Sequence, residues 1–196
     1  METQEKPMNE QESLKLIYEM INSTKRNLKD DGGIFLFWGY LTLTAALLQF
    51  SLIKLGYGES SGWVWIILMP LGGIISGVIG YRNRKKEKVK TIIDTIMAYL
   101  WGGFGACLLV VFFVLGKYDY QMAFLPMIMM LYGIGTFVTG GFLKFRPLIL
   151  GGISCWVFAV AACFFSIEIH LILIALSLVT SYIIPGHLLL ASESNN

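Results

Sequence analysis

Residues 34–55, IFLFWGYLTLTAALLQFSLIKL, decide the fold, because this nearly uncharged run is long enough to cross a membrane as a helix. At a rise of 1.5 Å per residue, about 20 apolar residues span the roughly 30 Å of hydrocarbon in a bilayer. Five similar runs follow, at residues 62–81, 92–115, 122–143, 148–166 and 171–190. They are about twice as long as barrel strands and lack their strict alternation. The sequence therefore predicts an all-α, polytopic membrane bundle of six transmembrane helices.

The composition agrees with a membrane protein. Hydrophobic residues make up 56% of the chain and charged residues 14%, against about 45–50% and about 25% in soluble domains. The net charge of +2 is too small to indicate nucleic-acid binding. We expect a cytoplasmic arm (residues 1–33), a transmembrane domain (34–190) and a short cytoplasmic tail (191–196).

Lysine and arginine mark one side of the predicted bundle. Only Lys54 and Lys117 lie on the other side, and the remaining 13 of the 15 lie in the arm and in alternate connectors. Positive residues next to spans stay in the cytoplasm, so both termini are predicted to be cytoplasmic. The densest group is Arg82, Arg84, Lys85, Lys86 and Lys88. It is interpreted as a topology signal, or as a contact for anionic lipid or an acidic partner.

The arm is predicted to contain an amphipathic helix over residues 9–29. Leu14, Ile17, Ile21 and Leu28 recur at the spacing of one helix face. The following DDGG, residues 30–33, predicts a break before the first span. Two interpretations stay open: the helix lies on the bilayer surface, or its apolar stripe docks on a soluble cytoplasmic regulator or a second copy.

Small residues predict close packing between the spans. Gly73 and Gly77 form a GxxxG pattern, and Gly133 and Gly140 give another span a small face. Such faces let helices approach closely, either within one bundle or between copies in a homo-oligomer. A Trp-Gly pair recurs at residues 38–39 and 101–102, and a Leu-Gly pair stands at 150–151. Two interpretations stay open: three tandem helical hairpins, or a chance similarity between glycine-rich spans.

Three prolines are predicted to kink their spans: Pro70, Pro126 and Pro185. A proline inside a helix leaves a carbonyl one turn earlier without its partner. Transporters break helices at such points, although prolines also serve ordinary packing.

The sequence offers no reaction chemistry. No ionisable residue lies at the centre of a span, where transporters and pumps usually carry one. Glu168 and His170, in the turn between the last two spans, are interpreted as solvated residues, with a cation-binding or pH-sensing pair as the alternative. The two histidines are 17 residues apart, and the three cysteines lie inside apolar runs without a CxxC pattern. We therefore expect no catalytic residues, no metal and no cofactor.

Several stretches resemble a known family: QESLKLIYEMI in the arm, LMPLGGIISGVIGYRNRKK, MLYGIGTFVTGGFLKFRPLILGG and SYIIPGHLL. Over nearly the whole chain the sequence is similar to uncharacterised multispanning inner-membrane proteins of Bacteroidetes-type bacteria. The resemblance implies a bacterial inner-membrane setting and a gene often found beside a small winged-helix regulator. It implies no catalytic or ligand residues.

These observations favour a non-enzymatic membrane protein, regulatory or stress-related, whose arm binds a partner or its own copies. A small-solute transporter or channel is the alternative. The lipid bilayer is an expected partner, and nucleic acid is not.

Overall fold

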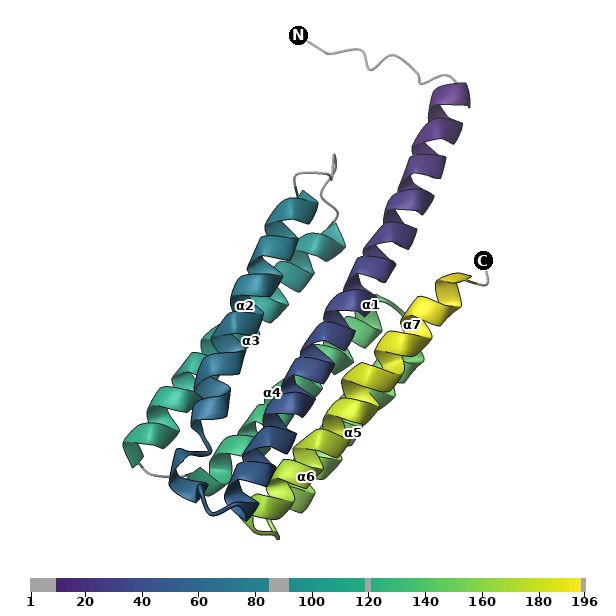
Figure 1. Ribbon diagram of the computed structural model, residues 1–196. Helices are drawn as coiled ribbons and strands as arrows, with labels where there is room; N and C mark the ends of the chain where they lie inside the picture. The colour runs from purple at the N-terminus through teal and green to yellow at the C-terminus, as the bar shows by residue number, and fades with distance from the viewer. Residues whose placement is uncertain (1–9, 85–91, 119–120, 195–196) are drawn as a thin grey trace.

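The chain folds into a bundle of long helices (Figure 1). The computed structural model describes residues 10–84, 92–118 and 121–194. Its helices are α1 (Glu10–Lys54), α2 (Trp63–Arg84), α3 (Ile92–Tyr118), α4 (Gln121–Phe142), α5 (Arg146–Ala162), α6 (Ile167–Leu178) and α7 (Ile184–Ser194). A short 3-10 turn, η1 (Gly58–Ser60), precedes α2, and a π-helical turn, η2 (Val179–Ile183), joins α6 to α7. The described residues contain no strand, so the predicted all-α class is confirmed.

Five segments are long and apolar enough to cross a membrane: Gly32–Lys54, Trp63–Arg82, Thr95–Tyr118, Met122–Phe142 and Ile167–Ala191. This chain is a membrane protein with several apolar helices. The last segment runs through α6, η2 and α7 as one rod. The remaining predicted span, residues 148–166, corresponds to α5, which has only 17 residues. Its length of about 25 Å falls short of a full hydrocarbon thickness.

The predicted break at residues 30–33 is wrong. Helix α1 continues without interruption for 45 residues, through both aspartates and both glycines (Figure 1). A glycine inside a helix costs only about 1 kcal/mol relative to alanine, which neighbouring contacts can offset. Gly32 supplies such a contact, since a Cβ placed there would lie 3.1 Å from Leu190 Cδ2. The glycine therefore allows α7 to approach α1 closely.

The core of the bundle lies between α1, α4, α5 and the α6–α7 rod. Helix α1 contacts α2, α6, η2 and α7, and α4 packs most closely on α5. Half of the apolar window of α4 is buried, against 6% for α3. Helix α3 is therefore peripheral and joins the bundle mainly through α4.

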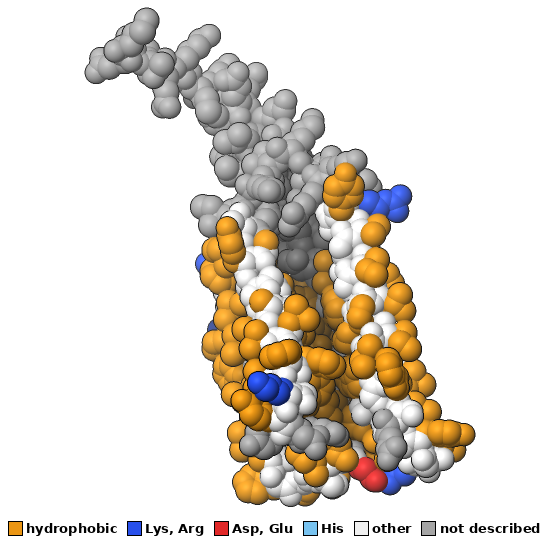
Figure 2. Space-filling model, turned by 90° about the vertical axis from the view of Figure 1, so that its left-hand side faces the viewer, with side chains coloured by type: hydrophobic (Ala, Val, Ile, Leu, Met, Phe, Trp, Pro, Cys, Tyr) orange, Lys and Arg blue, Asp and Glu red, His pale blue; other side chains and the backbone are white. Residues whose placement is uncertain are grey.

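Helices α2 and α3 form the outer side of the bundle. Helix α2 packs on α1, α3 packs on α4, and the two have little direct contact with each other. Figure 2 faces this side of the molecule and shows apolar side chains along it, with a hollow between two helices. Such an apolar surface suits hydrocarbon rather than water.

Candidate functional site

The π-helical turn η2 is the most irregular point inside the bundle. Pro185 follows it, and a proline cannot donate a backbone hydrogen bond and crowds the carbonyl four residues earlier. The backbone N–H of Ile184 instead bonds the carbonyl of Val179, five residues back. Single π turns within α-helices occur frequently at functional sites. We therefore take η2 and its neighbours as the candidate site.

The turn presents three consecutive polar side chains, Thr180, Ser181 and Tyr182, to the bundle. Ser181 Oγ donates to the Ser177 carbonyl at 2.6 Å. The hydroxyl of Thr180 lies 2.8 Å from that of Ser154 on α5. Hydroxyl bonds of this kind satisfy polar groups where no water is at hand and join neighbouring helices. The turn is thus tied to α5.

Glycines from two helices form the seat for η2. A Cβ at Gly39 of α1 would lie 2.9 Å from Tyr182 Cβ. One at Gly151 of α5 would lie 2.6 Å from Ser181 Cα. Both distances are shorter than ordinary carbon contacts of about 3.5–4.0 Å. Only glycine therefore lets α1 and α5 approach the turn this closely.

Tyr182 belongs to a group of five aromatic side chains, which we call the aromatic cluster: Phe35, Trp101, Phe104, Tyr132 and Tyr182. Neighbouring rings lie 5.2–6.5 Å apart between centroids. These are the separations of edge-to-face and tilted aromatic pairs, which are worth about 0.5–1.5 kcal/mol each beyond area burial. The cluster draws one ring or two from each of α1, α3, α4 and η2. It anchors the otherwise peripheral α3 to the core through Trp101.

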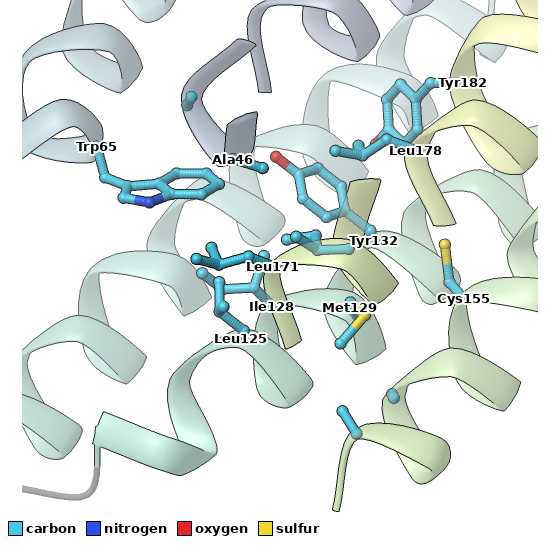
Figure 3. Packing of buried hydrophobic residues seen from close by; sticks show 14 of the residues in the cluster. Ala46, Trp65, Leu125, Ile128, Met129, Tyr132, Cys155, Leu171, Leu178 and Tyr182 are labelled. Atoms are coloured by element: carbon cyan, nitrogen blue, oxygen red, sulfur yellow. The ribbon is translucent and has the colours of Figure 1, made fainter. Parts of the chain in front are cut away.

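The two tyrosines of the aromatic cluster differ in their hydrogen bonding. Figure 3 shows Tyr132 and Tyr182 among the buried residues. The Tyr132 hydroxyl lies 3.5 Å from Thr42 Oγ1 on α1. The Tyr182 hydroxyl is buried without a hydrogen-bond partner. An unpaired buried hydroxyl costs about 1–3 kcal/mol, so the hydroxyl of Tyr182 lowers the free energy of unfolding of the bundle.

A second polar group lies at the end of the bundle where α5 meets α6. Lys54 of α1 forms an ion pair with Glu168 of α6. His170 is buried, with Nε2 2.6 Å from the Ala162 carbonyl and 2.9 Å from the Phe165 carbonyl. The interpretation of His170 as a solvated turn residue is therefore wrong, whereas the Glu168 side chain is 42% exposed and is paired with Lys54. Glu168 joins two helices, and His170 caps the carboxyl end of α5.

The chemistry available around η2 is that of neutral hydroxyls, a thiol and aromatic rings. Cys155, fully buried on α5, carries a free thiol. Within the described ranges, no three His, Cys, Asp or Glu side chains gather closely enough to hold a metal ion. The arrangement is suited to packing and to a change of helix geometry.

The predicted arm and basic residues are only partly visible. Leu14, Ile17, Ile21 and Leu28 lie on the helical backbone of α1, but their side chains lie outside the described residues. Arg82 is exposed near the end of α2. The side chain of Arg84 also lies outside the described residues, as do Lys85, Lys86 and Lys88 altogether.

The four glycines predicted for helix packing fall into two groups. A Cβ at Gly133 would lie 2.2 Å from Trp156 Nε1, and one at Gly140 would lie 2.7 Å from the Ile149 nitrogen. These two glycines lie in the α4–α5 contact. Gly73 and Gly77 have nothing within 4 Å of a Cβ, so the GxxxG face of α2 contacts no described part of this chain.

The three prolines also differ. Pro70 is exposed within α2 and Pro126 is buried within α4, and both helices continue through them. Pro185 is buried and follows the one described π-helical turn. Only here does a predicted kink coincide with a change of helix type.

Sequence reasoning missed the aromatic cluster and the burial of His170. The run Thr180-Ser181-Tyr182 before Pro185 could have indicated the irregular turn η2, because hydroxyl groups near a proline can bond the backbone carbonyls that the proline leaves without a partner. No comparable signal pointed to Tyr132.

Comparison of the chain with models of protein families, with curated proteins and with solved structures finds no match.

Proposed function

We propose that this chain is a non-enzymatic protein of a bacterial inner membrane whose arm binds a soluble cytoplasmic regulator or the arm of a second copy. The observation that supports this proposal is the continuity of α1. Its segment Gly32–Lys54 is a membrane span, yet the helix begins at Glu10. The 22 residues before the span extend about 33 Å beyond it as helix.

This geometry favours docking over the surface-bound alternative. A helix lying on the bilayer must turn sharply where it enters the membrane, and α1 is instead one unbroken helix from Glu10 to Lys54 (Figure 1). At about 100° per residue, Leu14, Ile17, Ile21 and Leu28 fall within about 60° of helix circumference. A helix that projects from the bilayer places such a stripe where a soluble partner can reach it.

The membrane span also stabilises the helical conformation of the arm. A stripe of about two heptads is too short to form a stable isolated helix in water. In α1 the arm extends a helix that the bundle has already nucleated. A partner therefore meets a partly ordered helix, which lowers the entropy lost on binding.

The packing of α1 connects the arm to the core of the bundle. Close glycine contacts hold α1 against α7 just below the arm, where a Cβ at Gly186 would lie 2.9 Å from Leu36 Cγ. The same helix then contacts η2 through Gly39. Binding at the arm would thus act on the helix that supports the π turn, which is the basis for a regulatory or stress-related role.

A stripe variant tests the proposal in native membranes. Leu14, Ile17, Ile21 and Leu28 are replaced by Gln, and the control replaces Glu12, Glu19, Asn22 and Arg26 on the opposite face by Ala. Each tagged protein is cross-linked in cells, purified and analysed by quantitative mass spectrometry; a second tag reports self-association. We expect the stripe variant alone to lose its cross-linked partner or second copy. Equal cross-links in all three proteins would refute the proposal.

One observation favours a second candidate, a small-solute transporter or channel. A π-helical turn before Pro185 that carries hydroxyls resembles the discontinuous helices at transporter binding sites. Flux through proteoliposomes would support it if the flux fell on replacement of Ser181 by Ala. Absence of flux across a broad solute panel would count against it.

A further inference from the structure

An apolar groove runs along the outside of the bundle between α1 and α6. Leu43, Leu47 and Phe50 line it from α1, and Ile172, Ala175 and Leu176 line it from α6. Its volume is about 200 Å³, and all of its lining residues are apolar. Both walls belong to membrane-spanning segments, so the groove opens towards hydrocarbon.

The groove has the length of one acyl chain within one leaflet. From Leu171 of α6 to Val179 of η2, the ends of one wall, the rise is about 12 Å. One leaflet contributes about 15 Å of hydrocarbon, half of the bilayer core.

A cation stands at one end of this groove. Lys54 lies one helical turn beyond Phe50, and its Nζ is 5.6 Å from the centroid of the Phe50 ring. Its side chain is 54% exposed, although it is paired with Glu168. Since Lys54 ends the membrane-spanning segment of α1, its ammonium lies at the depth of the lipid headgroups.

We propose that this groove binds a glycerophospholipid, with one acyl chain between α1 and α6 and the phosphate on Lys54. The apolar walls select the chain by shape and hydrophobicity. The ammonium group selects the phosphate by charge, and Glu168 competes with the phosphate for it. The site lies in the leaflet at the Lys54 end of the bundle, whichever way the protein faces.

The groove is tested by photo-crosslinking of the full chain in nanodiscs. The probe is phosphatidylglycerol with a diazirine in its acyl chain, diluted into palmitoyl-oleoyl phosphatidylglycerol, and adducts are mapped by mass spectrometry. We expect adducts on the peptides that contain Leu43–Phe50 and Leu171–Val179. Replacing Ala175 by Phe fills the groove and should reduce this labelling several-fold. The matched control is Ala106→Phe on the exposed face of α3, which should leave it unchanged.

Leu47→Trp provides a second groove variant that does not disturb the core, because Leu47 is 53% exposed. Unchanged groove labelling in this variant and in Ala175→Phe would overturn the proposal, as would equal labelling of α3 and the groove. Protein–protein cross-links from the groove to a second copy would also overturn it, because the groove would then be an interface between copies.

The charged end is tested by two substitutions that break the same ion pair. Lys54→Gln removes the phosphate contact and should weaken retention of phosphatidylglycerol in native mass spectrometry by about fivefold. Glu168→Gln frees Lys54 and should strengthen retention. A merely structural ion pair would make both variants behave alike, which would overturn the assignment of the phosphate to Lys54.

Discussion

The ring of Tyr132 on α4 meets the ring of Tyr182 on η2 edge to face, with centroids 5.3 Å apart and planes inclined by 80°. The two residues are 50 positions apart in the sequence, and each is almost completely buried. Their contact joins the most buried span to the π-helical turn. The geometry of the turn therefore depends on the position of α4, and a change in either helix must be accommodated by the other.

Replacing Tyr182 by Phe should leave stability unchanged or raise it. The ring and its contacts remain, while a buried hydroxyl without a partner is removed. The expected gain in the free energy of unfolding is up to about 3 kcal/mol, the upper end of the cost of an unpaired buried hydroxyl. Replacing Tyr182 by Ala should cost about 3–5 kcal/mol, because the ring leaves a cavity. Thermal unfolding in detergent measures both. A clear loss of stability in the Phe variant would show that the hydroxyl has a bonding role.

Two glycines should respond in opposite ways to alanine. A Cβ at Gly152 would lie 2.7 Å from the Phe137 nitrogen and 2.8 Å from the Gly133 carbonyl oxygen, both backbone atoms. Gly152→Ala should therefore separate α4 from α5 and cost about 1–3 kcal/mol of unfolding free energy. Gly73→Ala meets nothing within 4 Å and should be neutral or stabilise by up to about 1 kcal/mol. Unfolding temperatures compared in one detergent check the pair. Similar losses at both positions would show that α2 also has a close neighbour.

The helical class and most spans follow from the sequence because lipid imposes a single requirement. A segment without water must satisfy its own backbone, so a long apolar run is a helix almost regardless of its detail. Helix α5 is also helical but is shorter than a full span, and it is covered by α4 and the α6–α7 rod. The error at residues 30–33 arose from local propensity. Two aspartates and two glycines favour a break, but the contact of Gly32 with Leu190 is made across the bundle and has no local signature.

The candidate site was less accessible to prediction for a similar reason. The spacing of glycines predicts a helix face of small residues, but it does not predict whether that face contacts a neighbouring helix. Gly73 and Gly133 therefore look alike in sequence and differ in structure. Pro185 could be flagged as a kink from its residue type. Its consequence, a π turn that places Tyr182 against Tyr132, depends on which helices surround it.

The continuity of α1 can be measured as a distance. Spin labels at Lys15 and Leu48, in a cysteine-free background, are separated by 33 residues, which an unbroken helix places about 50 Å apart. We expect a narrow distribution at this distance in nanodiscs, because the labels share one rod. Gly33→Pro should shorten and broaden it by breaking the helix, whereas Gly33→Ala should preserve it, since a Cβ there meets nothing within 4 Å. A short, broad distance distribution in the parent protein would show that the helix breaks at residues 30–33 after all.

The orientation predicted from the charge bias can be tested with a native cysteine. Cys163 follows the last residue of α5, is exposed, and lies at the end of the bundle that carries Lys54. If the basic connectors are cytoplasmic, Cys163 faces the periplasm. With Cys107 and Cys155 replaced by Ala, a membrane-impermeant maleimide should label it in intact spheroplasts, since a thiol reacts only where water allows the thiolate to form. The control places the single cysteine at the opposite end, as Arg82→Cys with all three native cysteines replaced by Ala, and should label only after permeabilisation. The reverse labelling pattern would show that the bundle has the opposite orientation, with the arm in the periplasm, and would exclude a cytoplasmic regulator as its partner.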